Sequence, residues 1–388
     1  MSLEQLVQAL PGPQQKHLSP DAPMPARMMA AKGLAPLPPR EMVIVLCGLT
    51  LDGDERLSTS AAQSISKLPD KILGPALSAE LPDVALGILV RQLHERPEIA
   101  EPLFLNRKTP DDALAAIAAV VSAELGEILI GNQERCLRSK AIVDGLRQNP
   151  NVLRSSKDRL FDFLVRSGVI HDDMAEFQEA FARLSPAEVQ EMSDNVALPK
   201  EALALTEDGA TLDAADDEDL EELEELVLEM EQTKEGNEAY KEIAEEDAKQ
   251  IPMLKLINGL NTAQKIALAM KGNKEARSIL IRDTNKMVSG SAIRSPRITE
   301  QEVRSAAQSR QIADDVIRYI AASRELSRSY SVKVALAKNP KTPQPTALKL
   351  LTLLRQSELK GIAKSKNVSS AVSNQAKRIL LRKTGGGK

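Results

Sequence analysis

The sequence is poor in aromatic side chains and in cysteine. Only 2% of its 388 residues are aromatic, and none is Trp, so Ala, Leu, Ile and Val must fill the interior, which suits closely packed helices. Cys47 and Cys136 are too few for a disulfide framework or a metal cluster and fit a reduced, cytoplasmic setting. No apolar run is long enough to span a bilayer. The first residues, MSLEQLVQAL, lack the basic start and long apolar core of a signal peptide.

Strand patterns are also missing. No stretch alternates apolar and polar residues with period two, and none is rich in β-branched and aromatic residues. The apolar run MVIVLCGL at Met42–Leu49 is the one candidate strand. Because the surrounding sequence is helical in pattern, we predict a buried helix there and an all-α fold for the protein.

Catalytic and metal-binding motifs are lacking as well. The sequence has no Gly-rich loop after a strand, no Gly-Lys-Ser phosphate motif and no His-Glu-x-x-His. His17, His94 and His171 are far apart, and HDDM at His171 fits a loop that opens a helix better than a metal site. DGDER at Asp52 begins like a calcium loop but has Arg and Leu at the fifth and sixth positions. We therefore predict turns at both motifs, no enzyme, and no metal, cofactor or small-molecule substrate.

Charge is distributed very unevenly along the chain. The formal net charge is −4, yet residues 251–388 contain 27 Lys and Arg against 8 Asp and Glu, a net +19. Residues 205–250 contain 3 basic against 19 acidic residues, a net −16. Such asymmetry favours a binding function over a catalytic one.

The same composition divides the chain into five segments. Residues 1–40 are rich in Pro, Gly and Ala, which predicts a flexible arm. Residues 41–204 predict an N-terminal array of short helices, and residues 205–250 an acidic linker. A basic C-terminal helical array follows over residues 251–381, and residues 382–388 form a tail.

Similar clusters of turn residues recur between the predicted helices. NPKTPQPTAL at Asn339 resembles NRKTPDDALA at Asn106, and we expect Thr342 and Thr109 to be helix N-caps with Pro at the first helical position. Thr299 with Glu302, and Ser185 with Glu188, predict capping boxes. In the C-terminal half the turns recur at spacings of 23, 14, 14, 16 and 26 residues; the middle three hold about one helix and its turn, and the two wider ones would hold two helices. This predicts two arrays of short helices stacked as α-solenoids.

Units such as ALAKNPKTPQPTALKLL resemble the leucine-rich-repeat variant and related HEAT-like α-solenoids of bacteria. The resemblance covers the repeated stretches, and the C-terminal half is also similar to uncharacterised bacterial proteins. It implies an elongated helical scaffold. The iron–sulfur domain found with one such repeat protein does not carry over, because two cysteines cannot supply four thiolate ligands.

Two features predict binding surfaces. In DLEELEELVLEMEQ, apolar residues recur at helical spacing between carboxylates, namely Leu220, Leu223, Val227 and Met230. This pattern fits an amphipathic recognition helix and a charged linker equally well. Basic residues flank six turns of the C-terminal array, and in a solenoid equivalent turns align. We therefore expect one positive ridge formed by Lys271, Lys274, Arg294, Arg297, Arg310, Arg324, Lys338, Lys341, Lys364 and Lys366.

These features predict a non-catalytic scaffold or adaptor whose basic array docks an acidic protein. A short tether gives the acidic linker a high effective concentration at the array, so the linker is also predicted to mask it. The alternative is a nucleic-acid-binding protein that contacts phosphates, although two tyrosines in residues 251–388 leave little for base stacking. An anionic membrane surface is a third, less favoured partner, because no aromatic-rich anchor is evident.

Overall fold

The computed structural model describes residues 3–206, 253–365 and 367–385. In these residues the regular elements are all helices, joined by turns, with one isolated bridge between Thr206 and Gly272. The predicted all-α fold is therefore confirmed. The chain forms two compact units, Met1–Leu164 and Val165–Lys388, which we call unit 1 and unit 2.

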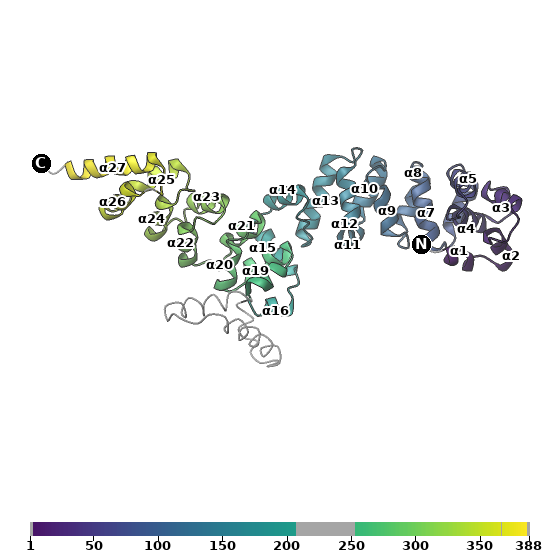
Figure 1. The fold of residues 1–388 in the computed structure, drawn as a ribbon, viewed down its shortest axis with the longest axis horizontal. Coiled ribbons are helices and arrows are strands. Elements are labelled where there is room, and N and C mark those ends of the chain that lie inside the picture. Colours follow the sequence, from purple (N-terminus) through teal and green to yellow (C-terminus); the bar gives the residue numbers. More distant parts are fainter. Residues whose placement is uncertain (1–2, 207–252, 366, 386–388) are drawn as a thin grey trace, which may run out of the picture. The chain divides into compact units, whose positions relative to one another are not determined.

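Unit 1 is a series of short helices (Figure 1). They are α1 (Leu3–Gln8), α2 (Gly12–Gln15), the 3₁₀ helix η1 (Lys16–Leu18), α3 (Met24–Ala31), α4 (Pro39–Thr50), α5 (Glu55–Ser66), α6 (Asp70–Ser78), α7 (Asp83–Leu93), α8 (Pro97–Leu105), α9 (Asp111–Ile117), α10 (Ala123–Gly131), α11 (Gln133–Arg138) and α12 (Lys140–Gln148). Helix α13 (Arg154–Arg166) crosses the division between the units. Helices α4, α7, α9 and α12 pack one on the next, and α6, α8 and α10 do the same, so the unit has two layers.

The first 40 residues differ from the predicted flexible arm. Residues 3–31 form three short α-helices and one 3₁₀ helix that bury Leu6 and Leu18 and pack on α4. The contact is close: a Cβ added at Gly48 of α4 would lie 2.5 Å from the Leu18 side chain. The prolines that suggested disorder stand at helix starts, with Pro11 and Pro23 as N-cap residues, where the missing N–H costs nothing.

Helix α4 forms the centre of the first part of unit 1. Every residue from Val43 to Leu49 is buried, so the predicted buried helix at Met42–Leu49 is confirmed. A helix buried on all sides has no polar face, which explains why its sequence resembles a buried strand.

Unit 2 continues the same design. Its helices are α14 (Ala175–Arg183), α15 (Pro186–Asn195), α16 (Lys200–Leu203), helical residues 253–259, α19 (Thr262–Lys271), α20 (Lys274–Leu280), α21 (Lys286–Arg294), α22 (Glu300–Gln308), α23 (Asp314–Ala322), α24 (Tyr330–Lys338), α25 (Gln344–Leu351), α26 (Gln356–Lys364) and α27 (Ser370–Gly385). Helices α19, α21 and α23 pack in succession, as do α22, α24 and α26. In Figure 1 the labels α22, α24 and α26 lie below α23, α25 and α27, so consecutive helices alternate between two layers.

Unit 2 includes chain from both sides of residues 207–252. Helix α15 packs on α19, and the Asn273 N–H donates to the Leu205 carbonyl at 2.7 Å. The Thr262 hydroxyl donates to the Asp172 carboxylate at 2.7 Å. The division between the units thus falls 40 residues before the predicted boundary at residue 204, and the predicted acidic linker lies almost wholly outside the described residues.

Candidate functional site

The two turns that resemble each other in sequence have the same hydrogen bonds. The Thr109 hydroxyl donates to the Leu103 carbonyl, and the Thr342 hydroxyl to the Leu336 carbonyl, both at 2.6 Å. The side-chain oxygens of Asn106 and Asn339 each accept from the backbone N–H two residues later, both at 2.9 Å. The internal similarity between these turns therefore reflects one repeated local structure.

The role predicted for the two threonines is wrong. Helix α9 begins at Asp111 and α25 at Gln344, with Pro110 and Pro343 at the N-cap positions. Each Thr is buried and its hydroxyl closes the preceding helix instead of capping the next one. Proline at the N-cap leaves no side-chain acceptor for the first turn. The capping boxes at Ser185 and Thr299 are confirmed.

Polar side chains tie each turn to the turn about 30 residues earlier. The Asn149 amide donates to the carbonyls of Ala118 and Val121 at 2.9 and 3.0 Å. The Asn339 amide donates to those of Ala307 and Ser309 at 2.8 and 2.9 Å. Both asparagines are buried, where an unpaired amide would be costly. These bonds hold successive turns in register.

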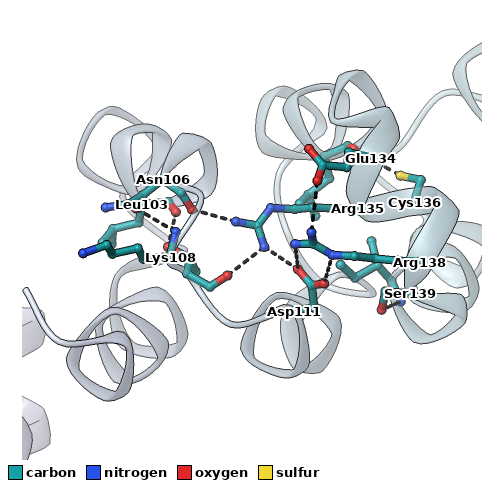
Figure 2. A network of polar contacts seen from close by, with 12 residues as sticks. Leu103, Asn106, Lys108, Asp111, Glu134, Arg135, Cys136, Arg138 and Ser139 are labelled. Atoms are coloured by element: carbon teal, nitrogen blue, oxygen red, sulfur yellow. Dashed lines mark hydrogen bonds and ion pairs between the residues drawn. The ribbon is translucent and has the colours of Figure 1, made fainter.

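In unit 1 the buried side chain of Arg135 also links successive turns by hydrogen bonds (Figure 2). Arg135 is 2% exposed and donates to the carbonyls of Thr109 and Asn106 at 2.7 and 2.6 Å. It also forms an ion pair with Asp111, whose carboxylate accepts from Arg138 at 2.5 Å as well. The hydrogen bond from Arg138 and the pairing with Arg135 outweigh partial burial and lower the pKa of Asp111.

Unit 2 has a counterpart in the pair Arg277 and Glu302. Both side chains are 2% exposed, and Arg277 Nε donates to Glu302 Oε1 at 2.9 Å. Arg277 Nη1 also donates to the Gly272 carbonyl at 2.6 Å. Glu302 completes the Thr299 capping box. Burial opposes ionisation of Glu302, but the hydrogen bonds from Arg277 and Thr299 prevail and lower its pKa.

Because consecutive helices alternate in direction, the turns of unit 2 lie on two edges. Edge A holds the turns after α19, α21, α23 and α25; there Arg297 Nη1 donates to the Lys271 carbonyl at 3.2 Å, and the Arg355 N–H donates to the Tyr330 hydroxyl at 2.9 Å. Edge B holds the turns after α20, α22, α24 and α26; there Lys341 Nζ donates to the Ile312 carbonyl at 2.6 Å.

The basic residues predicted from the sequence are divided between these edges. Edge A carries Lys271, Lys274, Arg294, Arg297 and Arg324, and edge B carries Arg310, Lys338, Lys341 and Lys364. Lys366 lies outside the described residues. The expectation of one ridge is therefore not met: a turn spacing of one helix places neighbouring turns on opposite edges.

Several of these residues are engaged inside the protein. Lys271 pairs with Asp194 at 3.3 Å, Lys338 with Glu358 at 2.6 Å and Lys341 with Asp314 at 3.4 Å. Lys274 Nζ donates to the Gln301 side chain at 2.9 Å. Arg310, Arg324 and Lys364 are exposed and have no hydrogen-bond or ion-pair partner among the described residues. Arg294 is also exposed, and its guanidinium carbon lies 4.7 Å from the centre of the Tyr319 ring.

The Arg–Tyr contacts on edge A were not predicted from the sequence. Besides Arg294 on Tyr319, the Arg355 guanidinium carbon lies 5.2 Å from the centre of the Tyr330 ring. Each pair is separated by 25 residues, the span from one edge-A turn to the next. That common spacing is the one signal in the sequence that could have revealed them.

The remaining predictions from the sequence concern the apolar residues of DLEELEELVLEMEQ, the two cysteines and the DGDER motif. Leu220, Leu223, Val227 and Met230 lie outside the described residues. Cys47 and Cys136 are buried as expected, and burial, with a contribution from Asp111, raises the pKa of Cys136 to about 12, which makes it a poor nucleophile. Asp54 of the DGDER motif caps α5 by accepting from the Arg56 and Leu57 N–H groups.

No protein-family model and no curated protein matches the sequence. Among the described residues, no group of three or more His, Cys, Asp or Glu side chains could hold a metal ion. In the same residues, no helix combines the length and apolar character needed to cross a membrane.

Proposed function

We propose that the protein is a non-catalytic cytoplasmic scaffold or adaptor whose basic helical array, residues 251–381, docks an acidic partner protein. We further propose that its two layers of short helices are a HEAT-like or leucine-rich-repeat-variant α-solenoid. The alternating contacts of α19 to α27 support this classification, because solenoids stack units that cannot bury their apolar faces alone.

The observation that carries the proposal is the imbalance between paired and unpaired charge. Five of the eight carboxylates in residues 251–388 form ion pairs within the array: Asp283, Glu302, Asp314, Asp315 and Glu358. Exposed basic side chains without a partner among the described residues include Arg282, Arg304, Arg310, Arg324, Lys349, Lys360 and Lys364. The surplus of exposed positive charge favours an anionic partner.

The acidic linker is proposed to regulate this docking. Its charge of −16 is opposite to that of the array, and the chain reaches it at Thr206, which bridges to Gly272 next to Lys271. A tethered competitor of this kind lowers the apparent affinity for an external partner. Deleting residues 207–250 should therefore tighten binding of an acidic probe at low and at physiological salt; equal binding with and without these residues would refute masking.

The main test is affinity capture with the full-length protein, using lysates washed at increasing salt. Acidic proteins should be retained at low salt and released as salt screens the charges. A matched variant with five exposed array residues from both edges changed to Glu, namely Arg294, Arg310, Arg324, Arg355 and Lys364, should retain far less. Equal retention by both proteins would contradict the proposal.

The second candidate is a nucleic-acid-binding protein that contacts phosphates through the same exposed Arg and Lys side chains. Mobility-shift titrations with duplex and single-stranded probes over a range of salt distinguish it. Tight binding whose logarithm falls steeply and linearly with the logarithm of salt concentration would favour this candidate. The absence of any shift at low salt would favour a protein partner.

A further inference from the structure

We propose that edge A, rather than edge B, is the surface that binds an acidic polypeptide segment, with Arg294, Arg324 and Arg355 as its main contacts. This inference rests on the proposed function and names the surface and the chemistry of its ligand. It follows from the position, preorganisation and availability of these three guanidinium groups.

The three arginines occupy successive levels of the array. Arg294 is the last residue of α21, Arg324 follows the end of α23 at Ala322, and Arg355 is the N-cap residue of α26 after α25. Helices α21 and α23 pack directly, and packed helices lie about 8–10 Å apart, so the guanidinium groups of Arg294 and Arg324 are expected at about that interval. An extended peptide rises about 3.3 Å per residue, which brings every third side chain to one arginine. Carboxylates three residues apart therefore fit this edge.

Two of the three guanidinium groups are held in place before any ligand arrives. Arg294 stacks on Tyr319 and Arg355 on Tyr330, and the Arg355 backbone N–H donates to the same Tyr330 hydroxyl. A stacked guanidinium keeps its N–H edges free for a carboxylate, and less side-chain entropy is lost on binding.

The same stacks argue against single-stranded nucleic acid at this edge. Tyr319 and Tyr330 are the two tyrosines of the array, and residues 251–388 contain no Phe or Trp. One face of each ring is occupied by arginine. Binding of single strands gains much of its affinity from bases stacked on aromatic rings, so polypeptide carboxylates suit edge A better.

The two edges also differ in whether their carboxylates form ion pairs with basic side chains. On edge B, Asp283, Asp314 and Asp315 are paired with Lys265, Lys341 and Lys286. On edge A the carboxylates Glu275, Glu300 and Glu325 are interspersed among the cations.

None of these three edge-A carboxylates has an ion pair with Arg294, Arg324 or Arg355 among the described residues; Glu300 instead accepts from the hydroxyls of Ser329 and Ser331. The guanidinium groups of edge A thus remain available to an external carboxylate.

The test compares two triple variants of the full-length protein with fluorescently labelled poly-L-glutamate as the probe. The edge-A variant is Arg294→Ala, Arg324→Ala and Arg355→Ala. The matched edge-B control is Arg282→Ala, Arg310→Ala and Lys364→Ala, which removes the same charge from exposed positions. Loss of three exposed charge contacts should weaken binding about tenfold for edge A and less than about twofold for the control.

A second pair of variants tests preorganisation separately from charge. Tyr319→Phe keeps the ring beneath Arg294 and should leave affinity unchanged, whereas Tyr319→Leu removes the stack at constant charge and should weaken binding about twofold to threefold. Circular dichroism melts of all variants confirm that each is folded. Equal affinity of the Phe and Leu variants would overturn the role of the stack.

The outcomes separate this inference from the proposed function. Equal weakening by both triple variants would overturn edge A while leaving a diffuse basic surface as the docking site. No binding of poly-L-glutamate by the unmodified protein at low salt would overturn both. Tighter, edge-A-dependent binding of duplex RNA than of poly-L-glutamate would overturn the acidic polypeptide and support the nucleic-acid candidate.

Discussion

The buried pair Arg277 and Glu302 allows a quantitative test of how the array is held together. Replacing Glu302 with Gln removes the carboxylate that accepts from the Arg277 guanidinium, whose side chain is 2% exposed. Breaking a buried ion pair by removing one partner costs about 3–5 kcal/mol. Replacing Arg277 with Met should cost a similar amount, because it leaves the Glu302 carboxylate buried without its partner.

The double variant Arg277→Met, Glu302→Gln should recover most of the loss. Gln at position 302 can still complete the Thr299 capping box, and no buried charge remains. The Gly272 carbonyl, which accepts from Arg277 at 2.6 Å, loses one hydrogen bond worth about 1 kcal/mol. The double variant should therefore be about 1–2 kcal/mol less stable than the original protein, far less than the sum of the single changes.

Local hydrogen exchange is the appropriate assay, because two units do not unfold as one two-state system. Peptides that cover residues 262–308 report opening of α19 to α22 directly. Exchange free energies in the single variants should fall by about 3–5 kcal/mol or reach the exchange limit. Single losses below about 1 kcal/mol, or a double variant equal to the sum of the two, would refute the reasoning.

Three other predictions concern packing, turns and pH. Gly145→Ala should destabilise unit 1 by about 1–3 kcal/mol because the new Cβ would lie 2.6 Å from the Ala118 side chain, whereas Gly290→Ala, with no atom within 4 Å, should be neutral or stabilising; urea unfolding followed by circular dichroism distinguishes them. Thr342→Val should cost about 1 kcal/mol by removing the hydroxyl hydrogen bond to the Leu336 carbonyl, which still accepts from the Asn339 N–H, and Thr342→Ser, which keeps the hydroxyl, should cost less; exchange at α24 measures this. The pKa of Asp111 is lowered in the folded state, so its stabilisation is complete above its ordinary pKa of about 4 and is lost as pH falls through the folded value. Asp111→Asn should flatten that acid-side loss in pH-dependent melts.

Local features of the sequence predicted much of the fold. The absence of strand patterns and the punctuation by Asn, Pro and Thr indicated short helices, and the capping boxes at Ser185 and Thr299 formed as expected. Two predictions were wrong for the same reason, because they assigned proline its most common structural role: disorder in residues 1–40 and the first helical position after Thr342. At Pro11 and Pro23 it begins helices, and at Pro343 it displaces Thr342 from the N-cap.

The candidate site was harder to predict because it depends on geometry between distant residues. The basic residues were recognised, but their division between two edges follows from counting helices between turns, not from the turns themselves. The contact of Arg294 with Tyr319 joins helices that are adjacent only after folding. Likewise, Lys341 appeared exposed in sequence, but its ammonium group donates to the Ile312 carbonyl.

The alternation of turns limits how this architecture can change in length. Insertion or loss of a single helix would transfer every later turn to the opposite side and detach Asn339 from the carbonyls that it holds. Helices must therefore be gained or lost as pairs, in steps of about 30 residues. Relatives of this chain should vary in size by whole helical hairpins. Residues that face a ligand on one edge should then remain in turns that are separated by an even number of helices.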